Sequence, residues 1–319
     1  GAPFLHPYKN QILLGDIFIF PDLLSRKKEE QEKFESGKAI NSIALFDYKQ
    51  EKHRFLLIGE EKSGKTTMCK RLFESYYNNQ YIPLYIQGDS LKHSCLDDFI
   101  KVLNKAFSNQ YNKDFLEYFI QLSSEKKLII IDDFHECKLN TKYKSSLIQE
   151  LINVFPNIII TGNEILEIED IIKGDGYSKP IYGDFEEYKI MEFGHFKRSE
   201  LITKWHTMGR EHLIEEAELL KNHDKSQQIM DSIIGNNLVP SYPIFLLTLL
   251  QTMEIGNPHS LKESTYGYYY YALIFQSLAR VGLSHDDLDA YLNYISELAY
   301  YLFYKKLLEV AESNLSSFH

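Results

Sequence analysis

The chain has 319 residues, 44% of them hydrophobic and 25% charged, which is enough for a packed core and two domains. Its formal net charge is −10, from 35 Lys and Arg against 45 Asp and Glu. A nucleic-acid binder needs a surplus of cations to displace counterions from phosphates, so DNA or RNA is disfavoured as the main ligand. The longest apolar run near a helix, Ile244–Leu250, is too short to span a bilayer, which argues against a membrane protein.

Three widely spaced cysteines, Cys69, Cys95 and Cys137, indicate a reducing compartment, the cytoplasm, and argue against a disulfide framework. The chain opens on Gly-Ala-Pro without Met and ends directly after a helical pattern. We therefore expect it to be a piece of a longer protein.

The hydrophobic pattern divides the chain into three regions. Residues 1–50 are expected to be an N-terminal extension or linker, residues 51–193 alternate apolar strands with helices, and residues 194–319 consist of helices. In the middle region we expect strands at Phe55–Ile58, Tyr81–Ile86, Leu128–Ile131, Ile158–Ile160 and Tyr188–Phe193. Helices are expected at Lys65–Tyr77, Leu96–Phe107, Phe115–Leu122, Ser145–Val154, Ser199–Thr207, His212–Leu220, Ile244–Met253, Tyr266–Ala279 and Leu288–Leu308. The alternation predicts an α/β fold: a parallel sheet flanked by helices, followed by an all-helical module.

The segment Gly59-Glu-Glu-Lys-Ser-Gly-Lys-Thr66 matches the phosphate-binding pattern G-x-x-x-x-G-K-[ST] in full, between a predicted strand and a predicted helix. The glycines let the backbone turn so that N–H groups and the positive helix end face an anion. Lys65 is expected to neutralise the β- and γ-phosphates of a nucleotide, and the Thr66 hydroxyl to bind Mg²⁺. The full set of expected nucleotide contacts here is Gly59, Glu61, Lys62, Ser63, Gly64, Lys65, Thr66 and Thr67.

A second acidic motif, Leu128-Ile-Ile-Ile-Asp132-Asp133, places two carboxylates at the end of an apolar strand, as in a Walker B motif. Such a continuous apolar run is typical of a parallel strand buried on both faces. Asp132 is expected to hold the magnesium. Either Glu136 or Asp133 could orient the attacking water, and Glu136 is preferred. The fourth strand ends in Thr161-Gly162-Asn163, whose polar side chains either sense the γ-phosphate or cap the following helix.

These motifs resemble those of the STAND class of signal-transduction NTPases, in its NACHT-like branch, which is common in bacterial defence proteins. The similar segments are Gly59–Thr66, Ile131–Glu136, Ile158–Thr161, Phe193–Phe196 with a helix carrying Glu200, Lys204 and Trp205, and Pro243–Leu247. The resemblance spans about residues 50–310. It implies that Pro243 packs against the adenine and that the helical module leads into a winged-helix-like region.

The resemblance also implies a function. An ATP- or ADP-dependent switch would hydrolyse ATP slowly and self-associate when bound to ATP, with an N-terminal effector and a C-terminal sensor outside this chain. Two residues depart from the family pattern and disfavour efficient hydrolysis: Asn163 stands where an Arg is usual, and His135 precedes Glu136. The alternatives are a nucleotide-binding scaffold that does not hydrolyse, a DNA-engaging AAA+ ATPase and, as a minor option, a small-molecule kinase.

Overall fold

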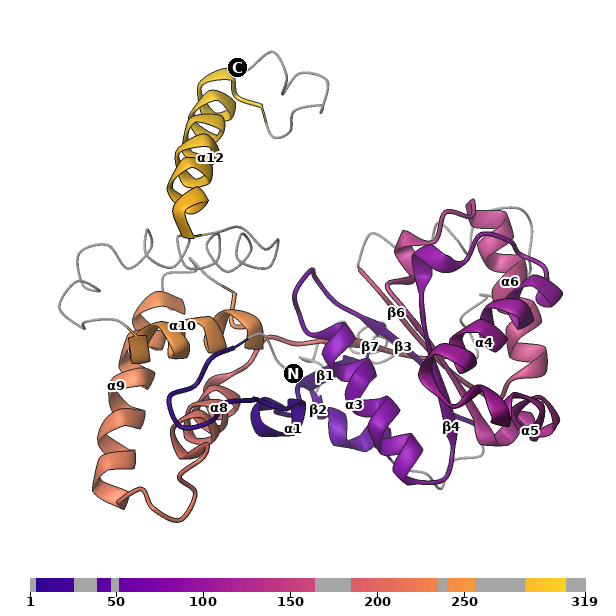
Figure 1. Ribbon diagram of the computed structural model, residues 1–319, viewed down its shortest axis with the longest axis horizontal. Coiled ribbons are helices and arrows are strands. Elements are labelled where there is room, and N and C mark those ends of the chain that lie inside the picture. Colours follow the sequence, from indigo (N-terminus) through magenta and orange to yellow (C-terminus); the bar gives the residue numbers. More distant parts are fainter. Residues whose placement is uncertain are drawn as a thin grey trace, which may run out of the picture. The chain divides into compact units, whose positions relative to one another are not determined.

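The computed structural model describes residues 4–25, 39–46, 52–163, 185–234, 240–255 and 285–307 (Figure 1). The chain forms two compact units, residues 1–251 and 252–319. The boundary expected between residues 193 and 194 lies inside the first unit. The expected helix Tyr266–Ala279 and most of the region expected to lead into a winged helix lie outside the described residues.

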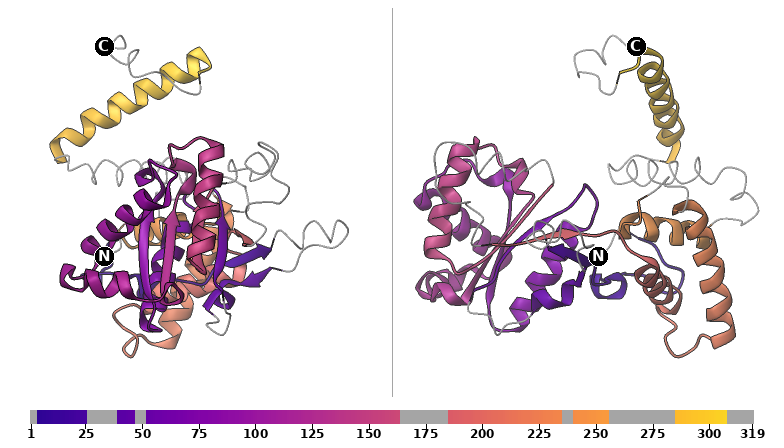
Figure 2. Two further views of the ribbon diagram at one scale, coloured as in Figure 1. Left: turned by 90° about the vertical axis from the view of Figure 1, so that its right-hand side faces the viewer. Right: turned by 180° about the vertical axis from the view of Figure 1, so that it is seen from behind.

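A seven-stranded mixed sheet with the strand order β2-β1-β7-β3-β6-β5-β4 forms the centre of the first unit. The strands are β1 (Asp22–Ser25), β2 (Ile40–Asn41), β3 (Arg54–Ile58), β4 (Ile82–Gln87), β5 (Lys127–Asp132), β6 (Asn157–Gly162) and β7 (Glu186–Ile190). The five strands from β3 to β7 run parallel, as predicted. β1 pairs antiparallel with both β2 and β7, so the segment expected to be an extension supplies two strands of the sheet (Figure 2).

Helices cover both faces of the parallel strands (Figure 1). α3 (Lys65–Asn78) lies on one face, and α4 (Leu96–Gln110) and α6 (Thr141–Val154) lie on the other, with the short α5 (Leu116–Gln121) after α4. Side chains alternate along a strand. On β5, Leu128 and Ile130 therefore pack with α3, while Ile129 and Ile131 pack with α4 and α6. This two-sided burial explains why β5 has an uninterrupted apolar sequence.

Short helical turns connect these elements. They are α1 (Leu14–Ile17) and the 3₁₀ helices η1 (Ser42–Phe46), η2 (Gly88–Ser90), η3 (Lys113–Phe115), η4 (Ser124–Lys126) and η5 (Phe134–Glu136). Of these, η2 follows β4 and η5 follows β5, so both lie at the carboxyl ends of the parallel strands.

The helical module of the first unit contains α8 (His195–Thr207), α9 (Glu216–Ile234) and the start of α10 (Pro243–Ile255). The predicted helix at His212–Leu220 had the wrong limits. Residues 211–214 form a turn, and the helix continues to Ile234 because one face, including Met230 and Ile233, is buried despite a polar sequence. The second unit contains α12 (His285–Lys305). None of the helices among the described residues is long and apolar enough to cross a bilayer.

The N-terminal segment packs against this helical module. His6 Nε2 lies 3.0 Å from the carbonyl oxygen of Trp205, and the two rings meet edge to face with centroids 4.9 Å apart. The Leu5 amide donates to Gln251 Oε1 at 2.9 Å, and the Lys204 ammonium donates to the Phe18 carbonyl at 2.8 Å. Residues 5–18 thus connect the helices with the edge of the sheet.

Candidate functional site

The loop between β3 and α3 has the backbone of a phosphate-binding loop. Gly64, the residue before α3, has φ of 103°, a conformation that favours glycine, and Lys62 also has a positive φ of 65°. The first N–H groups of a helix have no partner within the helix, and in α3 these belong to Lys65, Thr66 and Thr67. They are joined by the positive end of the helix dipole, so the loop suits an anion.

Lys65 is buried, and its ammonium is held by the loop itself. Nζ donates to the carbonyl oxygens of Gly59 at 2.9 Å and Glu60 at 2.8 Å. Burial lowers the pKa of Lys65, while the carboxylates of Asp133 and Asp132 act in the opposite direction. The P-loop cation and the acidic strand end are therefore close enough to interact electrostatically.

The other predicted loop residues differ in exposure. Glu61, Lys62 and Thr67 have exposed side chains. Ser63 is buried, and its hydroxyl has no hydrogen-bond partner among the described residues. A buried unsatisfied hydroxyl is uncommon in folded proteins, and at this place it is available to a ligand.

Asp132 is buried, with 1% of its surface exposed, and it lies on the face of the sheet that α3 covers. The pairing of Ile131 with Ile160 brings Thr161 beside Asp132, and the Thr161 hydroxyl donates to Asp132 Oδ1. The Cys69 thiol, on the second turn of α3, lies 3.7 Å from the same oxygen. Burial is also the main cause of the raised pKa of Cys69.

The two candidates for orienting water differ in their surroundings. Asp133 is half-buried with φ of 51°, and its pKa is raised by burial and by Asp132, against the opposing influence of Lys65 and His135. Its amide donates to Thr161 Oγ1 at 2.8 Å, which fixes the turn into η5. Glu136 ends η5 with an exposed side chain.

Thr161 is the penultimate residue of β6, and Asn163 directly follows the strand. β6 pairs with both β3 and β5. The Gly59 amide donates to the Gly162 carbonyl at 3.2 Å, so Asn163 lies beside the start of the P-loop. Its Oδ1 is buried and has no hydrogen-bond partner in the part of the chain that the structure describes. The Thr161 hydroxyl, by contrast, is already occupied by Asp132 and the Asp133 amide.

A short path of contacts leads from the P-loop to Pro243. A Cβ on Gly59 would lie 3.5 Å from the Cβ of Ile190, the last residue of β7. Three residues later the Phe193 amide donates to the Ser241 carbonyl at 2.8 Å, and the Ser241 hydroxyl donates back to the Phe193 carbonyl at 2.7 Å. Pro243 begins α10 immediately after this link.

The acidic strand end fits a magnesium ion. Asp132 and Thr66 offer hard oxygen donors, and no group of three or more His, Cys, Asp and Glu among the described residues could hold a metal alone. Mg²⁺ commonly takes only one or two carboxylates and completes its shell with phosphates and waters. The residues therefore suit an ion that is shared with a bound nucleotide.

Two residues near Asp132 escaped the sequence analysis. The Tyr85 hydroxyl donates to Asp132 Oδ2, and Gly88 lies so close to Asp133 that a Cβ there would come 2.3 Å from the Asp133 carbonyl oxygen. Both follow from the pairing of β4 with β5, which a single sequence does not specify.

Comparison with known proteins agrees with a P-loop NTPase fold. Residues 49–165 match the family model of an AAA domain. No curated protein is significantly similar to the chain. Similar solved structures include domain III of the Thermotoga maritima replication initiation protein DnaA, at 13% identity and a TM-score of 0.39, covering 72% of this chain and 87% of that chain.

Two further structures have comparable scores. AMPPCP-bound DnaA from Aquifex aeolicus is 14% identical, with a TM-score of 0.41 and coverage of 71% of this chain and 62% of that one. A RuvB variant from Thermotoga maritima is 14% identical, with a TM-score of 0.36, and the match covers 83% of this chain and 85% of that one.

Proposed function

We propose that this chain, with its AAA-type P-loop NTPase domain, is a nucleotide-dependent switch in a larger signalling or antiviral-defence protein of the NACHT-like STAND type. It binds ATP or ADP with Mg²⁺, hydrolyses ATP slowly and controls self-association. The observation that carries the proposal is the buried Lys65 ammonium, which is held by P-loop carbonyls and lies in the field of Asp132 and Asp133. A cation, a helix amino end and a buried carboxylate together match the charge pattern of a magnesium nucleotide.

Each group has a separate task in this proposal. The backbone amides around Gly64 and the Lys65 ammonium bind the phosphates, and Thr66 and Asp132 hold Mg²⁺, whose charge helps to neutralise them. Asp133 is a stronger candidate than Glu136 to orient the attacking water, because it is half-buried and carries a raised pKa. A carboxylate with a raised pKa is the better general base near neutral pH.

The link from β7 to α10 offers a route from the nucleotide to the helical module. Ser241 is tied to Phe193 by two hydrogen bonds and donates from its amide to Glu192 Oε2 at 2.7 Å. A nucleotide shifts a conformational equilibrium only through contacts that differ between the two states. Pro243, which follows this link, would sense the adenine, and Asn163 would sense the γ-phosphate.

The decisive test is nucleotide binding by Lys65→Ala, with Lys70→Ala as the control. Both lysines belong to α3, but Lys70 is exposed and Lys65 is buried in the loop. Titration calorimetry with ATP and Mg²⁺ should show binding for wild type and Lys70→Ala and none for Lys65→Ala. Equal affinity in all three proteins would refute the site. Mass spectrometry of the copurifying nucleotide, with ADP expected, would identify the resting state.

A non-hydrolysing scaffold is the second candidate, because Asn163 stands where an Arg is usual and His135 precedes Glu136. Single-turnover hydrolysis separates the two functions: slow turnover that Asp133→Asn abolishes supports the switch, whereas no turnover in any variant supports the scaffold. Self-association is tested on the longer protein by light scattering with ATP and with ADP.

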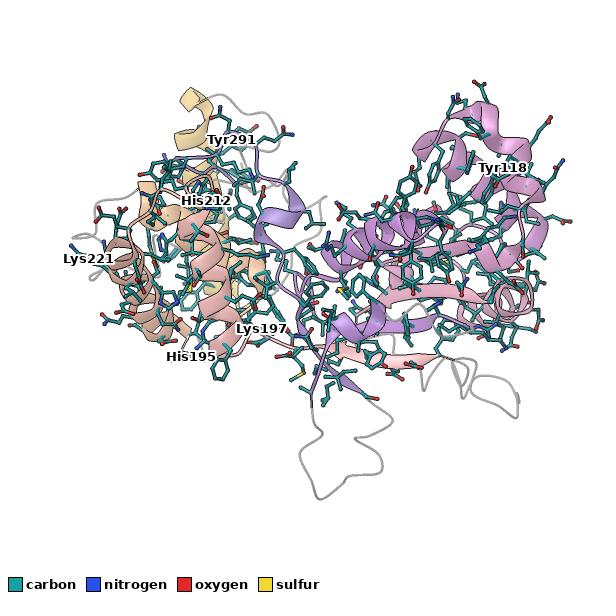
Figure 3. The ribbon with its side chains drawn as sticks, turned by 90° about the horizontal axis from the view of Figure 1, so that it is seen from below. Tyr118, His195, Lys197, His212, Lys221 and Tyr291 are labelled. Atoms are coloured by element: carbon teal, nitrogen blue, oxygen red, sulfur yellow. The ribbon has the colours of Figure 1, made fainter. Side chains whose placement is uncertain are left out.

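A DNA-engaging role has less support, because cations on α8 and α9 are mixed with acids. Lys197 lies 4.0 Å from Asp22, and Lys221 shares α9 with Glu216 and Glu218 (Figure 3). A duplex-DNA titration at two salt concentrations tests it. Binding that weakens steeply with salt would support DNA as a partner.

A further inference from the structure

Tyr85 reaches the carboxylate of Asp132 from the neighbouring strand. β4 and β5 run parallel, with Tyr85 paired with Ile130 and Gln87 paired with Asp132. Residues two apart on a strand point to the same face. Tyr85 therefore extends diagonally along the α3 face, and its hydroxyl donates to Asp132 Oδ2. Burial is the largest cause of the raised pKa of Tyr85, followed by its hydrogen bond to Asp132, so the phenol keeps its proton.

The main chain of Tyr85 is fixed as well. β4 is one of the two edge strands of the sheet, and Gln110, the last residue of α4, takes the place of a further strand. Gln110 Oε1 accepts from the Tyr85 amide at 3.0 Å, and Nε2 donates to the Tyr85 carbonyl at 2.7 Å. These two bonds hold the residue whose hydroxyl meets Asp132.

The donors around Asp132 leave few directions for a further ligand. A carboxylate offers about four acceptor sites. Oδ1 accepts from Thr161 and lies near the Cys69 thiol, and Oδ2 accepts from Tyr85. Three of the sites are thus occupied by this chain, and the remaining one is on Oδ2, beside the Tyr85 hydroxyl.

We propose that Tyr85 is a positioning residue for Mg²⁺: its hydroxyl orients Asp132 so that the remaining acceptor site of Oδ2 meets the magnesium or its water. The inference rests on the proposed nucleotide site. Residues that orient a metal-binding carboxylate typically change metal affinity about 10- to 100-fold when they are removed. Thr161 remains as a second donor, so Tyr85→Phe should show the lower end of this range, about 10-fold.

The test measures binding of a fluorescent ATP analogue over a range of Mg²⁺ concentrations, which requires no turnover. Tyr85→Phe should raise the Mg²⁺ concentration at half-maximal binding about 10-fold and leave binding in EDTA unchanged. In an Asp132→Asn background, Tyr85→Phe should have no further effect, because the carboxylate it orients is gone. Gln110→Ala keeps the hydroxyl and should shift the midpoint in the same direction by less.

Tyr111→Phe is the matched control. Tyr111 is also a half-buried tyrosine next to β4, but its hydroxyl donates to the Pro83 carbonyl at 2.8 Å, far along the strand from Asp132. It should lose comparable thermal stability and keep the wild-type Mg²⁺ midpoint. Circular dichroism melts without nucleotide establish whether each variant folds. If Tyr85→Phe does not fold, the Mg²⁺ midpoint of Gln110→Ala tests the inference in its place.

The outcomes separate the two proposals. If wild type binds with a Mg²⁺ dependence that Lys65→Ala abolishes, but Tyr85→Phe and Gln110→Ala keep the wild-type midpoint, the inference fails and the nucleotide site stands. An equal shift in Tyr111→Phe, or an additive effect in the Asp132→Asn background, would also overturn it. If wild type binds no nucleotide at any Mg²⁺ concentration, both proposals fail together.

Discussion

Gly88→Ala tests the closest backbone contact at the acidic end of the sheet. A Cβ at residue 88 would lie 2.3 Å from the Asp133 carbonyl oxygen and 2.8 Å from the Phe134 Cα. An ordinary carbon–oxygen contact is about 3.3 Å or longer, so one main chain must move by ~1 Å. Over-packing of this kind costs about 1–3 kcal/mol. For a unit of this size that corresponds to a loss of about 2–12 °C in melting temperature.

The same displacement should impair function, because the Asp133 amide and Asp132 share the Thr161 hydroxyl. A shift of ~1 Å near reacting groups can cost about 100-fold in rate, so turnover should fall far more than ATP affinity. Calorimetric melting and single-turnover hydrolysis provide the two readouts.

Gly15→Ala is the control for Gly88→Ala. Gly15 lies inside α1, and a Cβ there would meet nothing within 4 Å. Its replacement should leave turnover unchanged and stabilise the protein by about 0.4–1 kcal/mol through the unfolded chain. If Gly88→Ala melts and turns over like Gly15→Ala, the contact between η2 and η5 has no importance and the reasoning is wrong.

Three further outcomes are expected. In the folded chain, burial and Asp132 raise the pKa of Asp133 above its ordinary value of 3.8. The contribution of Asp133 to the free energy of unfolding is therefore greatest below pH 3.8 and is lost as the pH rises through the folded-state pKa. Asp133→Asn should therefore resist urea better than wild type at pH 7 and match it at pH 4. Asn157→Ala removes side-chain bonds to main-chain groups at the amino ends of β3 and β5, and should cost about 2–4 kcal/mol in urea unfolding without changing nucleotide affinity. His6→Ala removes the contact with Trp205, worth about 1–3 kcal/mol, and should speed proteolytic cleavage near residue 6 while the sheet stays protected.

The central strands were predictable because their sequences satisfy local rules. β5 and β6 are buried on both faces and have continuous apolar runs, and the P-loop follows β3 with all its required residue types. The expected strands near residues 55, 81, 128, 158 and 188 all exist, with limits that differ by a few residues. At β7, residues 191–193 leave the ladder with β3, although Met191 still bonds the Asp22 carbonyl and Phe193 bonds Ser241.

The antiparallel strands β1 and β2 lacked such a signal. They are four and two residues long; β1 pairs with β7, more than 160 residues later in the chain, and β2 pairs with β1. Short edge strands are defined by the partner that they meet, which local periodicity does not reveal. The length of α9 was missed for a related reason, because packing of its buried face overrides a polar sequence.

The residues of the candidate site also fall into those with a local sequence signal and those without one. Lys65 and Asp132 were predicted because each stands at a fixed distance from a strand end, and parallel strands bring their carboxyl ends to one edge. Tyr85 could not be found in this way, since a tyrosine inside an edge strand normally indicates packing. Only the register of β4 with β5 places its hydroxyl where it donates to the Asp132 carboxylate. Sequence motifs therefore locate the residues proposed to meet a nucleotide, whereas the residues that contact them from neighbouring strands follow from the order and register of the strands.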